Sequence, residues 1–239
     1  MATLLILGAK PDPALPPVSA WDDLACANAS GFSAAKYGLP DPAFTVITAM
    51  LTVGAAAGRQ SMQAMHGLHT DTLYFLHSTS RKTSLRQKHP LKFLRAALRA
   101  ARVTPASFRW AMSRAGYSWD HFIAAEVDSY VNAARHWCPG EEKLFAQAAS
   151  KRPSTGLVTL LIGLSLNRYD RFILSGFSFE LTHAYAQHPG IDQRGTRESR
   201  HLPTDIQFLQ CLSASLGNLF TTEAIVHELT GVPLLAQAD

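Results

Sequence analysis

Three short apolar runs in the first third of the chain constrain its fold more than any other feature. They read TLLILG, LACANAS and AFTVITAML, and connections rich in glycine, proline and aspartate separate them. Each run is continuously apolar and does not alternate with polar residues, which is typical of strands covered on both faces in a parallel sheet. Met62, Met65 and Leu68 have helical spacing ahead of the next apolar run, TLYFLHS, so we predict a crossover helix there.

The last hundred residues return to helices and strands. An apolar helix precedes the strand-like segment RFILSGFSF, a polar loop covers residues 180–203, and a helix follows in PTDIQFLQCLSASLG. The closing segment NLFTTEAIVHELTG has the pattern of a short strand and a helix. With 239 residues, of which 47% are hydrophobic, the chain can bury one substantial core. We therefore predict a single α/β domain over residues 1–239, with a Rossmann-like, mostly parallel sheet flanked by helices.

The middle of the chain differs in composition. Residues 81–119 contain ten lysines and arginines and no acidic residue, and LKFLRAALRAARV places leucines on one helical face and basic residues on the other. We expect a basic helical insertion over about residues 81–150, in which WDHFIAAEVDSYVNAARHW stays helical as far as the stop signal Cys138-Pro139-Gly140. Its basic face is either solvated or a surface for anionic lipid or phosphate. No nucleic-acid partner is expected, because interleaved aromatic residues are sparse.

Cysteine usage and the first residues bear on the compartment. The cysteines Cys26, Cys138 and Cys211 are odd in number and form no CxxC pair, so we expect reduced thiols in a reducing compartment. The segment MATLLILGAK has no basic residues before its apolar run, which favours a buried strand over a signal peptide. No apolar stretch approaches the roughly 18 residues of a membrane span. These features predict a cytoplasmic protein, with peripheral contact at the inner face of the membrane as an open alternative.

The segment KRPSTGLVTLLIGL begins with polar residues and continues as an apolar helix. Ser154 or Thr155 can cap this helix, and Gly156 allows a ligand to approach the backbone closely. The first N–H groups of a helix and the positive end of its dipole attract anions, and Arg152 adds a full charge. The residues therefore indicate either a plain helix cap or an anion-binding site.

A longer stretch, RPSTGLVTLLIGLSLNRYDRFILSGFSFE, resembles the small sialyl motif of sialyltransferases. It is also similar to the bacterial single-domain sialyltransferases of glycosyltransferase family 42. In that family a serine/threonine-glycine turn is followed by a strand ending in S-G-I-D-F, a tyrosine-bearing loop, and a histidine shortly before T-D at a helix start. The matching residues are Ser175 and Gly176 in SGFSF, Tyr185 in HAYAQH, and His201 and Asp205 in RHLPTDIQFL.

The N-terminal part resembles the same family less closely. Gly8 in LLILGAKPDPAL matches its first glycine-containing turn, and Asn28 in ACANAS matches an asparagine near the end of its second strand. Ala9 and Lys10 stand where the bacterial family has an asparagine-glycine pair that touches the nucleotide, so donor contacts at this turn must differ. The resemblance covers about half of the chain and leaves out the basic middle region.

The resemblance implies a GT-A-like transferase of bacterial polysaccharide biosynthesis that moves sialic acid, with inversion, from a CMP-activated donor to a glycan or glycolipid hydroxyl. CMP-Kdo is an alternative donor, because both sugars present a carboxylate. No metal or cofactor is expected, since no Asp-x-Asp pair follows an apolar strand, and His66 and His69 lack a third ligand. A catalytically silent protein that keeps the fold and binds nucleotide or membrane is the alternative from another class.

The same resemblance assigns roles to individual residues. The donor-binding residues are Gly8, Asn28, Arg152, Ser154, Thr155, Gly156, Ser175 and Gly176. Tyr185 would donate its phenol proton to the departing phosphate oxygen. His201 would be the general base, since imidazoles titrate near neutral pH. His183 and His188 are the competing candidates.

Three further assignments stay open. Asp205 either orients His201 or caps the helix that follows. The loop QRGTRESRH either clamps an anionic acceptor or carries solvated charges through Arg194, Arg197 and Arg200. Asn28 is as compatible with a turn as with a donor contact.

Overall fold

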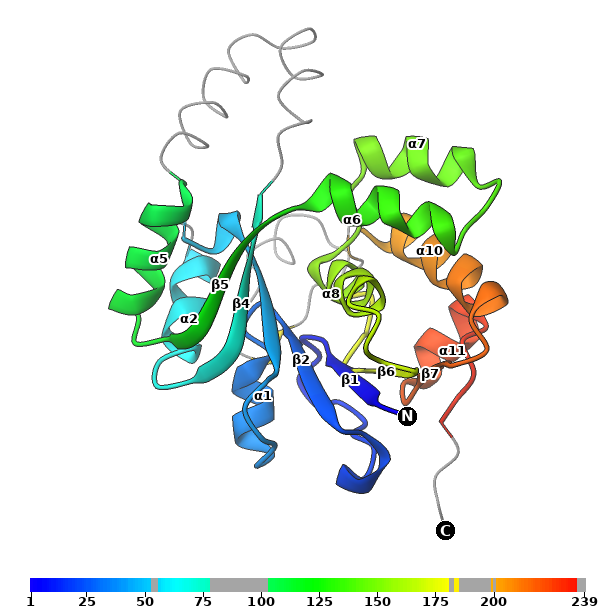
Figure 1. The fold of residues 1–239 in the computed structure, drawn as a ribbon. Helices are drawn as coiled ribbons and strands as arrows, with labels where there is room; N and C mark the ends of the chain where they lie inside the picture. Colours follow the sequence, from blue (N-terminus) through cyan, green and yellow to red (C-terminus); the bar gives the residue numbers. More distant parts are fainter. Residues whose placement is uncertain (53–55, 78–102, 181–182, 185–198, 200, 236–239) are drawn as a thin grey trace, which may run out of the picture.

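The computed structural model describes residues 1–52, 56–77, 103–180, 183–184, 199 and 201–235. Within them, seven strands form one parallel sheet in the order β5-β4-β3-β2-β1-β6-β7 (Figure 1). This confirms the predicted α/β class and its parallel sheet. The strands are β1 (Thr3–Leu7), β2 (Asp23–Ala27), β3 (Phe44–Thr48), β4 (His69–His77), β5 (Ser118–Glu126), β6 (Arg171–Ser175) and β7 (Leu219–Thr221).

Strand β1 lies in the interior of the sheet between β2 and β6. Leu4 pairs with Asp23 of β2 on one side and with Phe172 of β6 on the other. All five residues of β1 are buried. A strand with neighbours on both edges and helices on both faces has no side chain in water, which explains its continuous apolar sequence.

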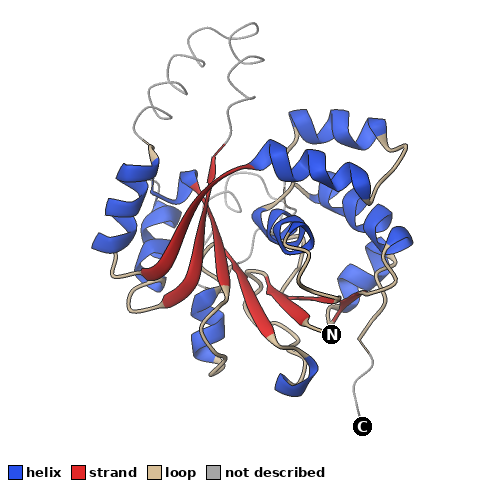
Figure 2. Cartoon of the chain, in the orientation of Figure 1, coloured by secondary structure: helices blue, strands red, loops and turns tan. Residues whose placement is uncertain are grey.

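Helices cover both faces of the sheet (Figures 1 and 2). One face carries α1, α2 and α5, and the other carries α6, α7, α8 and α10, with α11 beside β7. The α-helices are α1 (Gly31–Lys36), α2 (Ala56–Ala64), α5 (Pro105–Arg114), α6 (Val127–Ala133), α7 (Glu142–Ser150), α8 (Thr155–Ser165), α10 (Leu202–Ser215) and α11 (Ala224–Thr230). Short 3-10 turns are η1 (Val18–Ala20), η2 (Ala49–Thr52) and η3 (Ala134–His136).

Helix α8 is the predicted apolar helix, and it packs against β1, β2 and β3 on one side and α6 on the other. Its residues from Leu157 to Leu164 are all buried. A helix enclosed in this way is apolar around its whole circumference, and it can be polar only where it begins.

The prediction of an all-helical insertion is wrong for residues 118–126. They form β5, which pairs along its length with β4, from His69 opposite Ser118 to His77 opposite Glu126. Most β5 side chains are exposed or half-buried, because β5 is an edge strand. Its sequence therefore lacks the apolar run that identified the interior strands. The helical expectation holds for the following α6 and η3.

The prediction of three free thiols is also wrong. Cys138 and Cys211 form a disulfide with their Cα atoms 5.8 Å apart, and Cys26 is a buried free thiol. The paired cysteines are 73 residues apart in the sequence, so only the packing of α10 against the α6–α7 region brings them together. Spacing rules such as CxxC do not detect a pair of this kind.

The basic amphipathic helix predicted around residues 91–103 falls almost entirely outside the described residues. None of the helices in the described part of the chain combines the length and the hydropathy needed to cross a bilayer.

Candidate active site

The order of the strands indicates a candidate ligand site at the carboxyl ends of the strands. From β1 the chain builds the sheet outward through β2, β3, β4 and β5, and then crosses back to place β6 on the other side of β1. In open parallel sheets, ligands bind outside the carboxyl ends of the strands where the order reverses in this way. The reversal lies between β1 and β6, and it is called the switch point below. Four predicted donor-binding residues, Gly8, Asn28, Ser175 and Gly176, lie at the carboxyl ends of β1, β2 and β6.

Gly8 and Gly176 bring two backbone turns into contact at the switch point. Gly8 donates its N–H to the carbonyl of Ser175 at 2.8 Å, and Lys10 donates its N–H to the carbonyl of Gly176 at 3.0 Å. A Cβ atom on Gly8 would lie 2.3 Å from the Gly176 oxygen. Gly176 itself has a φ of 72°, which glycine adopts without steric cost. These glycines therefore allow the two turns to approach each other.

The side chains of Ser175 and Asn28 take part in the same framework. The buried Ser175 hydroxyl donates to the carbonyl of Ala14 at 2.9 Å. Asn28 has a φ of 54°, and its side-chain oxygen accepts the N–H of Thr48 at 3.3 Å. Asn28 therefore joins the ends of β2 and β3, which is the turn role that its sequence left open.

The start of α8 is capped as the sequence suggested. The Ser154 hydroxyl accepts the N–H of Leu157 at 3.2 Å. The ring of Phe177 fills the space beside Gly156, where a Cβ atom would lie 2.7 Å from the ring. Because Phe177 directly follows Gly176, this packing ties the first turn of α8 to the switch point. Thr155 is half-buried beside them.

His201 lies against the segment that leads into α8. Its Nδ1 is 2.6 Å from the carbonyl oxygen of Arg152. A carbonyl oxygen only accepts hydrogen bonds, so in the neutral ring Nδ1 carries the proton and Nε2 keeps a lone pair. The ring is half-buried, and it is oriented by a backbone group. This tautomer is the one that a histidine base using Nε2 requires.

Asp205 has neither of the two roles considered from the sequence. Its carboxylate is 5% exposed and accepts the N–H of Ser154 at 2.8 Å, so it joins α10 to the start of α8. Thr204 strengthens this junction, since its hydroxyl donates to the carbonyl of Lys151 at 2.9 Å and accepts from Gln147 at 3.2 Å. Sequence reasoning missed Thr204 and Gln147, because nothing local indicates that α7 and α10 meet there.

Burial raises the pKa of Asp205 to about 6, while hydrogen bonds from Ser154 and the nearby charge of His201 oppose that rise. Since this pKa lies above the ordinary value of 3.8, the folded protein keeps a proton that the unfolded chain has lost between about pH 4 and pH 6. The contribution of Asp205 to the free energy of unfolding is therefore fully present below pH 4. It is lost as the pH rises to 6, and the total loss is roughly 3 kcal/mol.

We expect Asp205→Asn to remove this pH dependence, because an amide oxygen still accepts the Ser154 N–H but does not ionise. The free energy of unfolding of the variant, relative to the wild type, should rise by roughly 3 kcal/mol between pH 4 and pH 7. Urea denaturation at four pH values measures this difference. Glu228→Gln, which changes an exposed acid on α11, is the matched control. Parallel stability curves for wild type and Asp205→Asn would contradict the assignment.

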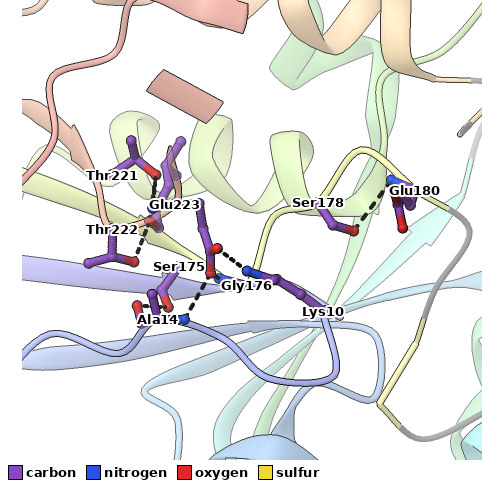
Figure 3. A network of polar contacts seen from close by, with 10 residues as sticks. Lys10, Ala14, Ser175, Gly176, Ser178, Glu180, Thr221, Thr222 and Glu223 are labelled. Carbon is purple, nitrogen blue, oxygen red and sulfur yellow. Dashed lines mark hydrogen bonds and ion pairs between the residues drawn. The ribbon is translucent and has the colours of Figure 1, made fainter. Parts of the chain in front are cut away.

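A second polar network, centred on Glu223, was not predicted from the sequence (Figure 3). Glu223 is 2% exposed and immediately precedes α11. Its carboxylate accepts the N–H of Gly176 at 2.8 Å and that of Ala14 at 3.0 Å, and it forms an ion pair with the ammonium of Lys10. The network therefore connects β7 to both turns of the switch point. One sign of this network is visible in the sequence, which is that Lys10 departs from the family pattern.

Several predicted residues lie outside the described part of the chain: Tyr185, His188, Arg194, Arg197 and Arg200. The start of their loop is placed, because Ala184 donates its N–H to the carbonyl of Ala9 at 2.9 Å. The chain next to His183 therefore passes beside the first glycine turn.

Within the described residues, one group has the composition of a metal site, and it lies at the amino ends of the strands, away from the switch point. His69, Asp71 and Asp120 place ligand atoms within 4.8 Å of one another at the amino ends of β4 and β5. His66, considered with His69 from the sequence, instead places its Nδ1 3.0 Å from the carbonyl of Ala115.

Comparison with solved structures bears on the fold. No protein-family model matches the chain, and none of the curated proteins is detectably similar in sequence. The structure is similar to that of the sialyltransferase CstII from Campylobacter jejuni in complex with the substrate analogue CMP-3FNeuAc, with a TM-score of 0.54 and 13% identity over 99% of this chain and 87% of that one.

Two further structures of the same sialyltransferase are also similar. A CMP complex of a variant has a TM-score of 0.57 and 14% identity, over 99% of this chain and 87% of that one. A complex with a trisaccharide acceptor and CMP has a TM-score of 0.54 and 14% identity, over 99% and 88% of the two chains. The chain therefore has a sialyltransferase-like fold.

Proposed function

We propose that the protein is an inverting, metal-independent glycosyltransferase that moves sialic acid from a CMP-activated donor to a hydroxyl group of a glycan or glycolipid acceptor. The observation that carries the proposal is the hydrogen bond between Nδ1 of His201 and the carbonyl of Arg152. In the neutral ring this bond leaves the lone pair on Nε2 at the front of α8, which is connected through Phe177 to the switch point. Two of the similar structures contain CMP, and one of these also contains a trisaccharide acceptor.

The proposed reaction needs one base and several anion binders. The acceptor oxygen forms a bond to the anomeric carbon of the donor, the bond from that carbon to the phosphate oxygen breaks, and CMP leaves with the electron pair. Nε2 of His201 takes the acceptor proton. In our proposal the phenol of Tyr185 gives a proton to the leaving phosphate.

The donor carboxylate is assigned to the start of α8. The N–H groups of Thr155 and Gly156 are among the first of that helix, where the backbone offers donors and the dipole favours an anion. Ser154 fixes this helix start through Leu157, and Arg152 adds a positive charge to the segment. Asn28 and the turns at Gly8 and Gly176 form the nucleotide side. Arg194, Arg197 and Arg200 are proposed to bind an anionic acceptor.

Nucleotide selectivity tests this function. We expect CMP to raise the melting temperature of the protein, and UMP, GMP and AMP to leave it unchanged, with the same result in the presence of EDTA. Transfer from CMP-sialic acid, compared with CMP-Kdo, then identifies the donor. The absence of a shift with every nucleotide would favour the catalytically silent alternative, and loss of transfer in EDTA would contradict metal independence.

A further inference from the structure

Lys10 places a positive charge at the switch point, where the other charged residues described are acidic. Among the described residues that connect the carboxyl ends of β1, β2, β3, β6 and β7 to the next helical element, it is the only lysine or arginine. The same connections contain the acidic residues Asp12, Glu180 and Glu223. Among these described residues, Lys10 is therefore the one that offers a full positive charge to a nucleotide phosphate.

Glu223 fixes the position of this charge. Its carboxylate is held by the N–H groups of Gly176 and Ala14, one from each turn, so it cannot move without breaking the framework (Figure 3). It pairs with the ammonium of Lys10. A lysine stem is otherwise flexible, and a cation already fixed in place loses less entropy when it binds an anion.

The ammonium is also able to bind a second group. The Lys10 side chain is 33% exposed, whereas that of Glu223 is 2% exposed, so the ion pair is buried on the carboxylate side and open on the ammonium side. An ammonium has three N–H donors, and one carboxylate oxygen engages only one of them. The pair therefore combines a rigid support with donor capacity beyond the bond to Glu223.

The first glycine turn and the loop after β6 meet around this residue. The backbone of Lys10 is bonded to Gly176, and the carbonyl of Ala9 accepts the N–H of Ala184. The connection after β6 therefore meets residues 9 and 10 at two points, and Glu223 brings in the connection after β7. A group bound at Lys10 would contact the same framework that supports Phe177 and the start of α8.

We propose that Lys10, held by Glu223, is the cationic ligand of the phosphate of the CMP donor. This inference rests on the proposed function and adds the phosphate-binding group at the turn where Ala9 and Lys10 depart from the family pattern. The phosphodiester carries one negative charge, and further negative charge develops on its bridging oxygen as the bond to the sugar breaks, until Tyr185 gives its proton to that oxygen. An ammonium at this place therefore stabilises the leaving group as well as the bound donor.

The test compares CMP with cytidine, which lacks the phosphate. We expect Lys10→Met to weaken CMP binding about tenfold, as for the loss of one charge-assisted hydrogen bond, and to leave cytidine binding unchanged. Lys10→Arg, which keeps the charge, should retain more CMP affinity than Lys10→Met. Ligand-observed NMR titration at low salt measures all of these affinities.

Lys36→Met is the matched control, because Lys36 forms the other ion pair to this loop, with Asp12 at 3.7 Å. It removes the same charge and should leave CMP binding unchanged. Equal CMP affinity for wild type and Lys10→Met would overturn the inference alone. Equal losses for CMP and cytidine would also overturn it, since they indicate a purely structural ion pair. Failure of the wild type to bind CMP would overturn the proposed function together with it.

Discussion

His201→Ala is expected to lower the rate of sialyl transfer by roughly 10²- to 10⁴-fold, the usual contribution of a positioned general base. CMP affinity should stay nearly unchanged, because the proposed base acts on the acceptor. The structure supports this separation, since the His201 ring is oriented by the carbonyl of Arg152 and not by a donor-binding side chain. Steady-state transfer rates and CMP titration, measured on the same preparations, test both parts.

His201→Asn tests whether His201 acts as a base or only as a structural link. An asparagine amide can still donate to the Arg152 carbonyl, but it offers no basic nitrogen. We expect this variant to be as inactive as His201→Ala while unfolding like the wild type. His66→Ala is the control, because His66 also has its Nδ1 near a backbone carbonyl, that of Ala115, yet lies in the connection leading to the amino end of β4. Substantial transfer by His201→Asn would show that the residue is a structural link and not the base.

The interior strands of the sheet were predictable, because residues buried on both faces of a sheet are apolar and appear as continuous apolar runs in the sequence. β1 is covered on both faces and paired on both edges, and its five residues are apolar except for Thr3. β5 has the same backbone geometry but a neighbour on one edge only, and Asp120 and His121 are exposed on it. β5 therefore lacks the continuous apolar run that identified the other strands. Whether a strand lies at the edge depends on the topology of the whole sheet, which a local sequence pattern does not reveal.

The candidate site was predictable where one short segment supplies the chemistry. The cap at Ser154 follows from a polar residue ahead of an apolar helix, and the structure contains it. His201 was selected by its place in a motif, but its partner is a backbone oxygen 49 residues away, which no side-chain pattern reveals. The role of Asp205 was missed for the same reason, since its partner is the Ser154 N–H.

Glu223 shows the same limit for a charged residue. In the sequence it is one acid in TTEAIV, with the appearance of an exposed residue at the start of a helix. Its three partners come from the turns after β1 and β6, which lie more than forty residues away in the chain. A buried carboxylate of this kind is stabilised only by partners that the completed fold brings together. Its structural role therefore cannot be recognised before the topology is known.

Gly8→Ala is expected to be the most destabilising single-methyl change at the site. The added Cβ would lie 2.3 Å from the backbone oxygen of Gly176, and that oxygen cannot rotate away as a side chain could. Both turns belong to strands whose ends are bonded to each other, so relief requires β1 and β6 to separate locally. Overpacking in a rigid interior costs about 3 kcal/mol, and we expect at least that loss in the free energy of unfolding.

Urea denaturation of Gly8→Ala and Gly217→Ala measures this effect against a matched control. Nothing lies within 4 Å of a Cβ atom on Gly217, so its substitution should change the free energy of unfolding by less than about 0.5 kcal/mol. In the part of the Gly8→Ala population that stays folded, the displaced Gly176 should also disturb the Phe177 contact with α8 and weaken CMP binding. Wild-type stability in Gly8→Ala would mean that the two turns are not in contact. The connection from the switch point through Gly176 and Phe177 to the helix start would then lose its basis.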